Sequence, residues 1–347
     1  MFLPNFPVSR ILHDDPSILT SNKIVGNSGY WFFRHIPDAE VEVLDNTSPF
    51  PFGWLSSKSK IELFQAFRAL LAQRDYDLVI SHSFNAGFVF GFLRSLLSHK
   101  NPPHFVIDVG SLNGGRRNRI QIAIVRFALK SVAGIIYHST ANEDFYSTCF
   151  PNLNREYIPF GVDTELFKPF AYEPSNDFIL SIGSTKRDYA TLTNAWRRID
   201  FPLRIVGSKK LSLDGMPNVQ LMDRVPINKL MKMIHDSRFV VLPIQNVRYS
   251  VGQMTLLQCM AMRKVVVVTN VIGASDYCTD DDNCITVRVR SPSDIIEKVD
   301  LLLRDTNRTE RIAANARESV SSRFSERGMA LRMLDFIKRT ISIKVSN

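Results

Sequence analysis

Hydrophobic positions along the chain follow two alternating patterns. Short runs such as 239–242 and 265–268 are apolar at every position, which is typical of parallel strands covered by helices on both faces. Between these runs lie longer stretches whose apolar residues recur at helical spacing. This alternation predicts α/β sheets with right-handed crossovers, in which ligands bind at the loops that follow the strands. Strands are expected at 1–6, 41–45, 78–81, 105–109, 134–138, 178–182, 203–206, 219–221, 239–242, 264–269 and 285–289. Helices are expected at 30–35, 58–73, 87–97, 119–131, 189–199, 227–235, 255–262, 292–303, 310–322 and 325–344.

Length and composition indicate a globular protein of two domains. The chain has 347 residues, of which 45% are hydrophobic and 22% are charged, a balance typical of soluble domains. No apolar run has the length of a membrane span, and no signal peptide is recognisable at the N-terminus. The four cysteines have no CxxC spacing, which favours reduced thiols and a cytoplasmic location.

The net charge of +9 arises entirely in the second half of the chain. Residues 1–165 carry 15 Lys/Arg and 15 Asp/Glu, whereas residues 166–347 carry 28 and 19. The excess indicates an anionic partner, such as a nucleotide, a nucleic acid or an acidic lipid, or else a solvated basic surface. Because aromatic and basic residues are not interleaved, no nucleic acid is expected.

A segment between the two halves carries the most informative motif. Residues 157–169 read Y-I-P-F-G-V-D-T-E-L-F-K-P. They resemble the inter-domain signature I-P-N-G-V-D-x-x-x-F-x-P of the GT-B glycosyltransferases, with Phe160 in the place of the Asn. The resemblance implies an α/β GT-B fold with two Rossmann-like domains facing across a cleft. The acceptor-side domain would span 1–165 and the nucleotide-sugar domain 166–324, with a terminal helix, 325–347, packing back on the first.

The segment 250–264 follows a predicted buried strand and opens a helix. A glycine-containing turn at a helix start presents free N–H groups that suit a diphosphate. The segment resembles the family motif E-G-F-G-x-x-x-L-E-A-M-A, with Ser250 and Gln258 at the two Glu positions. This departure leaves open an altered donor pocket, an inactive site or an ordinary buried helix start. The resemblance implies that the donor is bound by Ser250, Gly252, Gln253, Met254, Thr255, Leu256 and Gln258. Among these, the backbone N–H groups of 253–256 would hold the diphosphate, and Gln258 the ribose.

The loop after the first strand of the second domain carries two adjacent cations, Lys186 and Arg187. Such a pair is a natural clamp for two phosphates, unless both side chains face water. Residues 183–192 resemble the family loop G-R-x-x-x-[KR]-D/G-x-x-x-L. This resemblance implies that both cations act in catalysis by stabilising the leaving diphosphate, and that Gly183 is one of the donor-binding residues. Asp188 is expected to cap the following helix.

Further donor and catalytic candidates come from the resemblance. Val225, in a turn at 223–226, would contact the base. His82 matches a strand-end histidine of the family, for which a structural role is the alternative to a catalytic one. Asp108 is a candidate for contact with either sugar.

Two other groups in the first domain are candidates for the acceptor or the diphosphate. Gly26 and Gly29 stand where the family carries a Gly-Gly loop, although a plain turn fits equally well. Arg116, Arg117 and Arg119 follow a predicted strand end and would receive a phosphate-bearing or acidic acceptor, including a lipid head group. A solvated helix start is the alternative.

These features favour a retaining hexosyltransferase that resembles glycosyltransferase family 4. The donor would be a nucleoside-diphosphate sugar, with UDP favoured and GDP the alternative, and the acceptor a glycan or lipid-linked glycan. No cofactor and no metal are expected, and the acidic run 280–282 is interpreted as solvent-exposed. The alternatives are a GT-B sugar-nucleotide epimerase and a non-catalytic binding protein. Acceptors of this kind are compatible with peripheral contact at the cytoplasmic membrane face.

Overall fold

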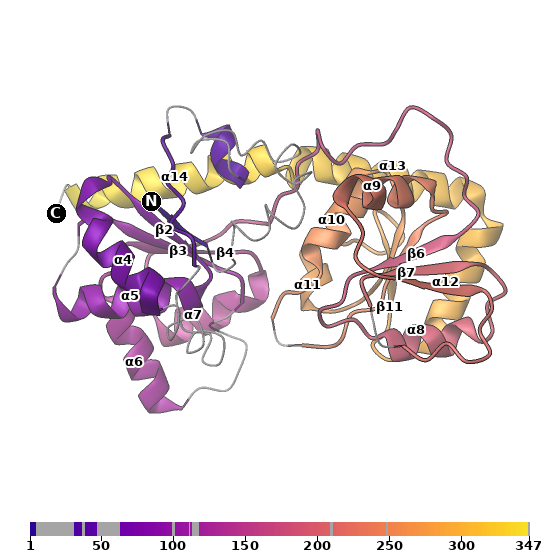
Figure 1. Cartoon of the computed structure of the whole chain (residues 1–347), viewed down its shortest axis with the longest axis horizontal. Helices are drawn as coiled ribbons and strands as arrows, with labels where there is room; N and C mark the ends of the chain where they lie inside the picture. Colours follow the sequence, from indigo (N-terminus) through magenta and orange to yellow (C-terminus); the bar gives the residue numbers. More distant parts are fainter. Residues whose placement is uncertain are drawn as a thin grey trace. The chain divides into compact units, whose positions relative to one another are not determined.

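The chain folds into two compact units. Unit 1 comprises Met1–Pro159 and Met329–Asn347, and unit 2 comprises Phe160–Gly328 (Figure 1). The computed structural model describes residues 1–4, 31–36, 39–46, 63–98, 101–110, 112, 118–208, 211–247 and 249–345. No helix within these ranges is long and apolar enough to span a membrane.

Unit 1 is built on a parallel sheet. In their spatial order, its described strands are β1 (Phe2–Leu3), β2 (Val79–His82), β3 (His104–Asp108), β4 (Gly134–Tyr137) and β5 (Arg155–Tyr157). Val43 adds a single parallel bridge to Phe2. From this edge onward the chain always steps in the same direction across the sheet, so right-handed crossovers place the connecting helices on one face.

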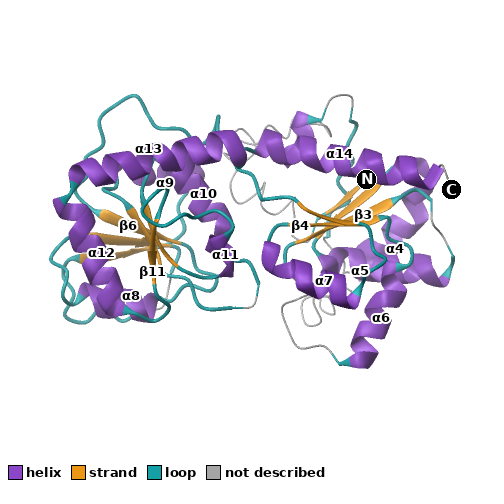
Figure 2. Cartoon of the chain, turned by 180° about the vertical axis from the view of Figure 1, so that it is seen from behind, coloured by secondary structure: helices purple, strands orange, loops and turns teal. Residues whose placement is uncertain are grey.

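Helices cover both faces of this sheet. The connecting helices are α4 (Leu63–Ala72), η3 (Gln73–Asp75), α5 (Phe84–Leu96), α6 (Arg119–Leu129), η4 (Thr140–Asn142) and α7 (Glu143–Cys149). The opposite face is covered by η2 (Trp31–His35) and α14 (Glu326–Val345), with Phe336 of α14 against Phe105 of β3. Figure 2 shows α14 on one side of the sheet and α4, α5 and α7 on the other.

Unit 2 contains a second parallel sheet, whose strand order reverses. In their spatial order, its described strands are β11 (Ile285–Val287), β10 (Val266–Thr269), β9 (Val240–Leu242), β6 (Ile179–Ile182), β7 (Leu203–Val206) and β8 (Val219–Met222). Its helices are α8 (Tyr189–Trp196), α9 (Ile227–Asp236), α10 (Gln253–Ala261), α11 (Ile272–Ser275), α12 (Pro292–Arg304) and α13 (Thr306–Arg323).

The core of unit 2 lies on both faces of its sheet. One cluster joins the strands to α9, α10 and the second half of α13, and the other joins them to α8, α12 and the first half of α13. Every residue of β9 and β10 is buried. The prediction that these apolar runs are strands covered on both faces is therefore confirmed.

The observed strands and helices differ from the predicted ones mostly at the edges of the sheets and at the starts of helices. The expected strand 41–45 is reduced to the one bridge at Val43, and β5, α7 and α11 were not expected. β5 reads Arg-Glu-Tyr and is only half-buried, so it lacks the apolar pattern of an interior strand. α13 begins at Thr306 rather than at 310, because the Asp305 side chain accepts a hydrogen bond from the Arg308 N–H and caps it.

Candidate functional site

The candidates of unit 2 converge where the strand order of its sheet reverses. From β6 the chain proceeds through β7 to β8, and it then crosses to β9, β10 and β11 on the other side. The loops after β6 and β9 therefore leave the sheet side by side, which is where open α/β sheets bind ligands. Backbone hydrogen bonds join these loops, from Asp188 N to Pro243 O (2.8 Å) and from Gln245 N to Lys186 O (3.0 Å).

Arg187 lies between these two loops and is 8% exposed. Its Nε donates to Ile182 O (2.8 Å) and its Nη1 to Thr185 O (3.1 Å). Its Nη2 approaches Thr255 Oγ1 of α10 at 3.4 Å. No carboxylate in the described ranges pairs with Arg187, and burial lowers the pKa of its guanidinium. A guanidinium has five N–H groups, so donors and an unbalanced positive charge remain for an anion.

Two glycines border this guanidinium, and Gly183 makes room for it. A Cβ on Gly183, whose φ is +110°, would lie 2.8 Å from Nη2 of Arg187. A Cβ on Gly252, whose φ is +90°, would lie 3.4 Å from Nη1 and 2.7 Å from Cδ1 of Ile244. Both positions thus require glycine for backbone conformation and for space. The sequence motifs placed both glycines at the site, and the structure shows that each stands against Arg187.

Helix α10 begins beside the same guanidinium. Gly252 is its N-cap residue, so the N–H groups of Gln253, Met254 and Thr255 fall in the first turn, where a helix offers no acceptors of its own. The positive end of the helix dipole adds to the charge of Arg187. Leu256 is a correction to the predicted donors, because its N–H already donates to Gly252 O (3.0 Å).

The two positions that depart from the family motif differ in their surroundings. Ser250 is buried, and its Oγ donates to Oε1 of Gln253 at 2.9 Å. Gln258 lies one turn into α10 and is half-buried. An amide both donates and accepts, so Gln258 offers hydrogen bonds to a pair of hydroxyls. The Ser250 hydroxyl is instead hydrogen-bonded to the side chain of Gln253, the first residue of the helix.

The other residues predicted in unit 2, Lys186, Val225 and Asp188, differ in burial and in their contacts. Lys186 is exposed and has a φ of +54°, so only Arg187 of the predicted cation pair is built into the fold. Val225, after β8, is half-buried against the core. The prediction that Asp188 caps α8 is confirmed, since its carboxylate accepts from the Thr191 N–H (3.2 Å) and the Thr191 hydroxyl (2.7 Å).

In unit 1, His82 and Asp108 lie at the carboxyl ends of the adjacent strands β2 and β3. Burial, with a contribution from His138, lowers the pKa of His82 to about 3, so its imidazole is uncharged at neutral pH. Asp108 is buried and accepts a hydrogen bond from the Tyr146 hydroxyl at 2.6 Å. Among the predicted acceptor-side residues, Arg119 is exposed at the start of α6. Gly26, Gly29, Arg116 and Arg117 lie outside the described residues.

Two residues at these sites were missed by sequence reasoning. His138 follows β4 and is buried, and its Nδ1–H donates to Ile158 O at 2.7 Å. Gly273 of α11 supports the loop before α10, because a Cβ there would lie 2.3 Å from Val251 O. His138 fell inside an expected strand, and the packing of Gly273 has no signal in the local sequence.

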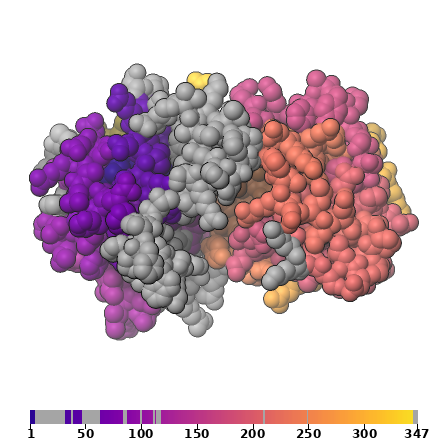
Figure 3. Space-filling model, viewed as in Figure 1, coloured from indigo at the N-terminus to yellow at the C-terminus, as the bar shows by residue number. Residues whose placement is uncertain are grey.

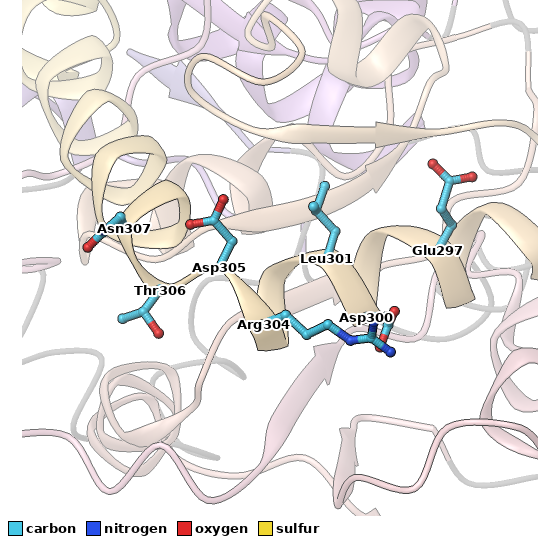
Figure 4. A pocket seen from close by; sticks show the side chains of 7 residues that line it. All are labelled: Glu297, Asp300, Leu301, Arg304, Asp305, Thr306 and Asn307. Atoms are coloured by element: carbon cyan, nitrogen blue, oxygen red, sulfur yellow. The ribbon is translucent and has the colours of Figure 1, made fainter.

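The structure also has a surface hollow of about 580 Å³ away from this site, at the junction of α12 and α13 (Figure 4). Its charged residues already have structural roles. Asp300 pairs with Arg304 at 2.9 Å, and Asp305 caps α13.

In the run 280–282, Asp280 and Asp282 are exposed, and the half-buried Asp281 is held by Arg308 at 2.8 Å. Asp280 accepts a hydrogen bond from the Thr286 N–H (2.7 Å) and Asp282 accepts one from Asn315 Nδ2 (2.9 Å), so each acidic side chain of the run has a partner in the fold.

Comparisons with known proteins bear on the second domain and on the fold of the chain. Residues 178–305 match the family model described as "Glycosyl transferases group 1". No curated protein matches the chain. Among solved structures, Anabaena HepE in complex with UDP has 16% identity and a TM-score of 0.69 over 97% of this chain and 99% of its own. A glycosyltransferase from Rickettsia africae has 15% identity and a TM-score of 0.67 over 98% of each chain. Sucrose-phosphate synthase from Thermosynechococcus elongatus has 17% identity and a TM-score of 0.66 over 81% and 79%.

At such identities the structural matches show the fold, whereas the family model identifies the domain that contains Arg187 and α10. Residues 178–305 therefore match the glycosyl transferases group 1 family, and the chain has the α/β fold of the GT-B glycosyltransferases.

Proposed function

We propose that this protein is a retaining glycosyltransferase that moves a hexosyl group from a nucleoside-diphosphate sugar to an acceptor hydroxyl. One observation carries the proposal. Arg187 is buried beside the N-terminus of α10, and no described carboxylate balances its charge. A buried cation without a counter-ion is costly, and a diphosphate would supply the missing negative charge as well as acceptors for the N–H groups.

The proposed mechanism places the leaving group at this site. As the bond between the sugar and the diphosphate breaks, negative charge grows on the departing phosphate oxygen. Arg187, Lys186 and the first N–H groups of α10 stabilise that charge, so no metal ion is needed for this step. The acceptor hydroxyl attacks from the face that the diphosphate leaves and gives its proton to the departing phosphate oxygen. No side chain acts as a nucleophile, so catalysis rests on positioning and charge stabilisation.

The proposed substrates follow from the site and from its structural relatives. HepE of Anabaena has been solved with UDP and with UDP-glucose, which favours a UDP-sugar donor over a GDP-sugar. Gln258 would bind the ribose and Val225 the base. We propose a glycan or lipid-linked glycan as the acceptor and His82 and Asp108 as residues that contact the sugars. The protein would act in the cytoplasm, in peripheral contact with the membrane.

A transfer assay tests this proposal and separates it from two alternatives. We expect UDP release from a UDP-sugar to rise when acceptor is added, and we expect NMR to show the anomeric configuration of the donor in the product. An inverted product would reject the retaining mechanism. Conversion of the sugar nucleotide without acceptor would identify an epimerase. Tight nucleotide binding without turnover would identify a non-catalytic protein. This outcome has to be tested because the Ser250 hydroxyl is bonded to Gln253 within the protein.

A further inference from the structure

Large apolar side chains are exposed mainly on one helical layer of unit 1. Of the eleven exposed large hydrophobic residues in the described ranges, seven lie on α4, on α6 and at the C-terminal end of α5. They are Leu63, Phe67, Leu71, Leu96, Leu97, Ile120 and Ile124. Helix α5 packs against α4 on one side and α6 on the other. The exposed apolar residues therefore belong to neighbouring helices of one layer, whose atoms reach the surface in purple in the view of Figure 3.

The exposed surface of α6 is divided into two parallel stripes. Residues three, four or seven positions apart share a helix face. Ile120, Ile124 and Phe127 have this spacing and form an apolar stripe, in which Ile120 is 72% exposed. The apolar stripe continues onto α5, because the rings of Phe127 and Phe92 are 5.1 Å apart.

The second stripe on α6 is basic. Arg119, Arg126 and Lys130 share a face and are all exposed. Lys130 Nζ lies 5.4 Å from the centroid of the Phe127 ring, so the two stripes are adjacent. The buried side of the helix is formed by Val125, Ala128 and Leu129.

Helix α4 carries an apolar stripe on the other side of α5 but no basic one, since its one cation, Arg68, is half-buried over the Phe64 ring. Leu63, Phe67 and Leu71 are spaced four residues apart, and Phe67 and Leu71 are 54% and 69% exposed. The buried side is formed by Gln65, Ala66 and Ala69. A face of this kind on a helix that is already packed by its other side is not needed for the core of the unit.

The charge of the layer identifies what it contacts. Helices α4, α5 and α6 contain no acidic residue, although acidic residues are common elsewhere in the chain. The exposed cations are therefore not balanced within these helices. The exposed cations Arg119, Arg126 and Lys130 adjoin the apolar stripe of α6, whereas Asp75 and Asp77 are exposed beyond the C-terminal end of α4. An apolar stripe flanked by unbalanced cations, as on α6, is complementary to a bilayer with anionic lipids, where apolar side chains enter the acyl boundary and cations meet phosphates.

We propose that the outer layer formed by α4, α5 and α6 docks the protein onto a membrane surface that contains anionic lipids. This inference deepens the proposed function by assigning a surface to the membrane contact. It uses neither Arg187 nor α10. The membrane-docking proposal and the donor-site proposal can therefore be disproved independently of each other.

Vesicle co-sedimentation tests this inference with the full chain. We expect binding to vesicles of phosphatidylcholine and phosphatidylglycerol, weak binding to phosphatidylcholine alone, and loss of binding as salt is raised. Ile120→Gln with Ile124→Gln, and separately Phe67→Gln with Leu71→Gln, should each weaken binding about tenfold or more. Arg126→Gln with Lys130→Gln should weaken binding to the anionic vesicles and reduce the salt dependence.

Leu331→Gln is the matched control. Leu331 is 45% exposed on α14, which covers the opposite face of the same sheet, so its replacement should leave vesicle binding unchanged. Nucleotide binding and thermal stability are measured for every variant to show that the fold is intact. The inference is overturned if the wild type does not bind anionic vesicles, or if the two apolar double variants bind like the control. It is also overturned if sedimentation velocity without vesicles shows a dimer that these variants dissociate. Transfer to a soluble acceptor without vesicle binding would overturn the inference and leave the proposed function intact.

Discussion

Replacement of Arg187 by Ala is expected to weaken nucleoside-diphosphate binding by about a hundredfold. The substitution removes the buried positive charge and every N–H group that the side chain offers to an anion. Charge-assisted hydrogen bonds contribute about 1.5–3 kcal/mol each, and about 1.4 kcal/mol corresponds to a tenfold change in affinity. Isothermal titration calorimetry with UDP measures the change. Arg187→Lys keeps the charge but loses the planar fork, so it should restore only part of the affinity.

The control for this substitution is Arg263→Ala. Arg263 lies in the same unit, but its side chain is 52% exposed and pairs with Glu310 at 3.4 Å. Its loss should leave UDP affinity unchanged. Arg187 also bonds Ile182 O and Thr185 O, so Arg187→Ala will lower the melting temperature as well. Affinity therefore has to be measured on folded protein well below that temperature. Equal UDP affinity in Arg187→Ala and Arg263→Ala would remove Arg187 from the site.

Replacement of Gly183 by Ala is expected to have the second-largest effect, although the new side chain is one methyl group. The added Cβ would meet Nη2 of Arg187 at 2.8 Å, and the φ of +110° is one that alanine rarely adopts. The guanidinium must move or the loop must change, at a cost of about 1–3 kcal/mol. We expect UDP affinity to fall at least about tenfold, together with stability in urea.

Gly215→Ala separates the effect of the positive φ from the effect of the contact with Arg187. Gly215 has a φ of +72°, and a Cβ there would meet nothing within 4 Å. This variant therefore carries the backbone cost without the contact with Arg187, and it should lose about 1 kcal/mol of stability at unchanged UDP affinity. If Gly183→Ala binds UDP as tightly as Gly215→Ala, Gly183 does not position the guanidinium.

The interior of the fold could be predicted from the sequence because burial leaves a simple pattern. β9 and β10 are apolar at nearly every position, and both are buried throughout. At the sheet edges, β5 and the bridge at Val43 are set by hydrogen bonding to a neighbouring strand. Those pairings depend on residues distant in the sequence, so no local pattern indicates them.

The candidate site was predictable in position but not in geometry. The motifs pointed to the loops after β6 and β9, and both loops do meet where the strand order reverses. They treated Lys186 and Arg187 alike, whereas Arg187 is buried between the loops and Lys186 is exposed. The difference arises because Arg187 forms a bridge with Ile244 of the other loop. The expected start of α10 at 255 was two residues late, since Gly252 takes a left-handed conformation that starts the helix at Gln253.

Calorimetric titration of the wild-type protein with UDP, GDP and ADP tests directly whether Arg187 and α10 form a diphosphate site. We expect that one nucleoside diphosphate, UDP, binds at a single site per chain. Raising salt should weaken that binding only modestly, because the cation that it meets is buried. If none of the three binds, the unbalanced charge of Arg187 does not mark a diphosphate site, and the proposed transferase function would be contradicted.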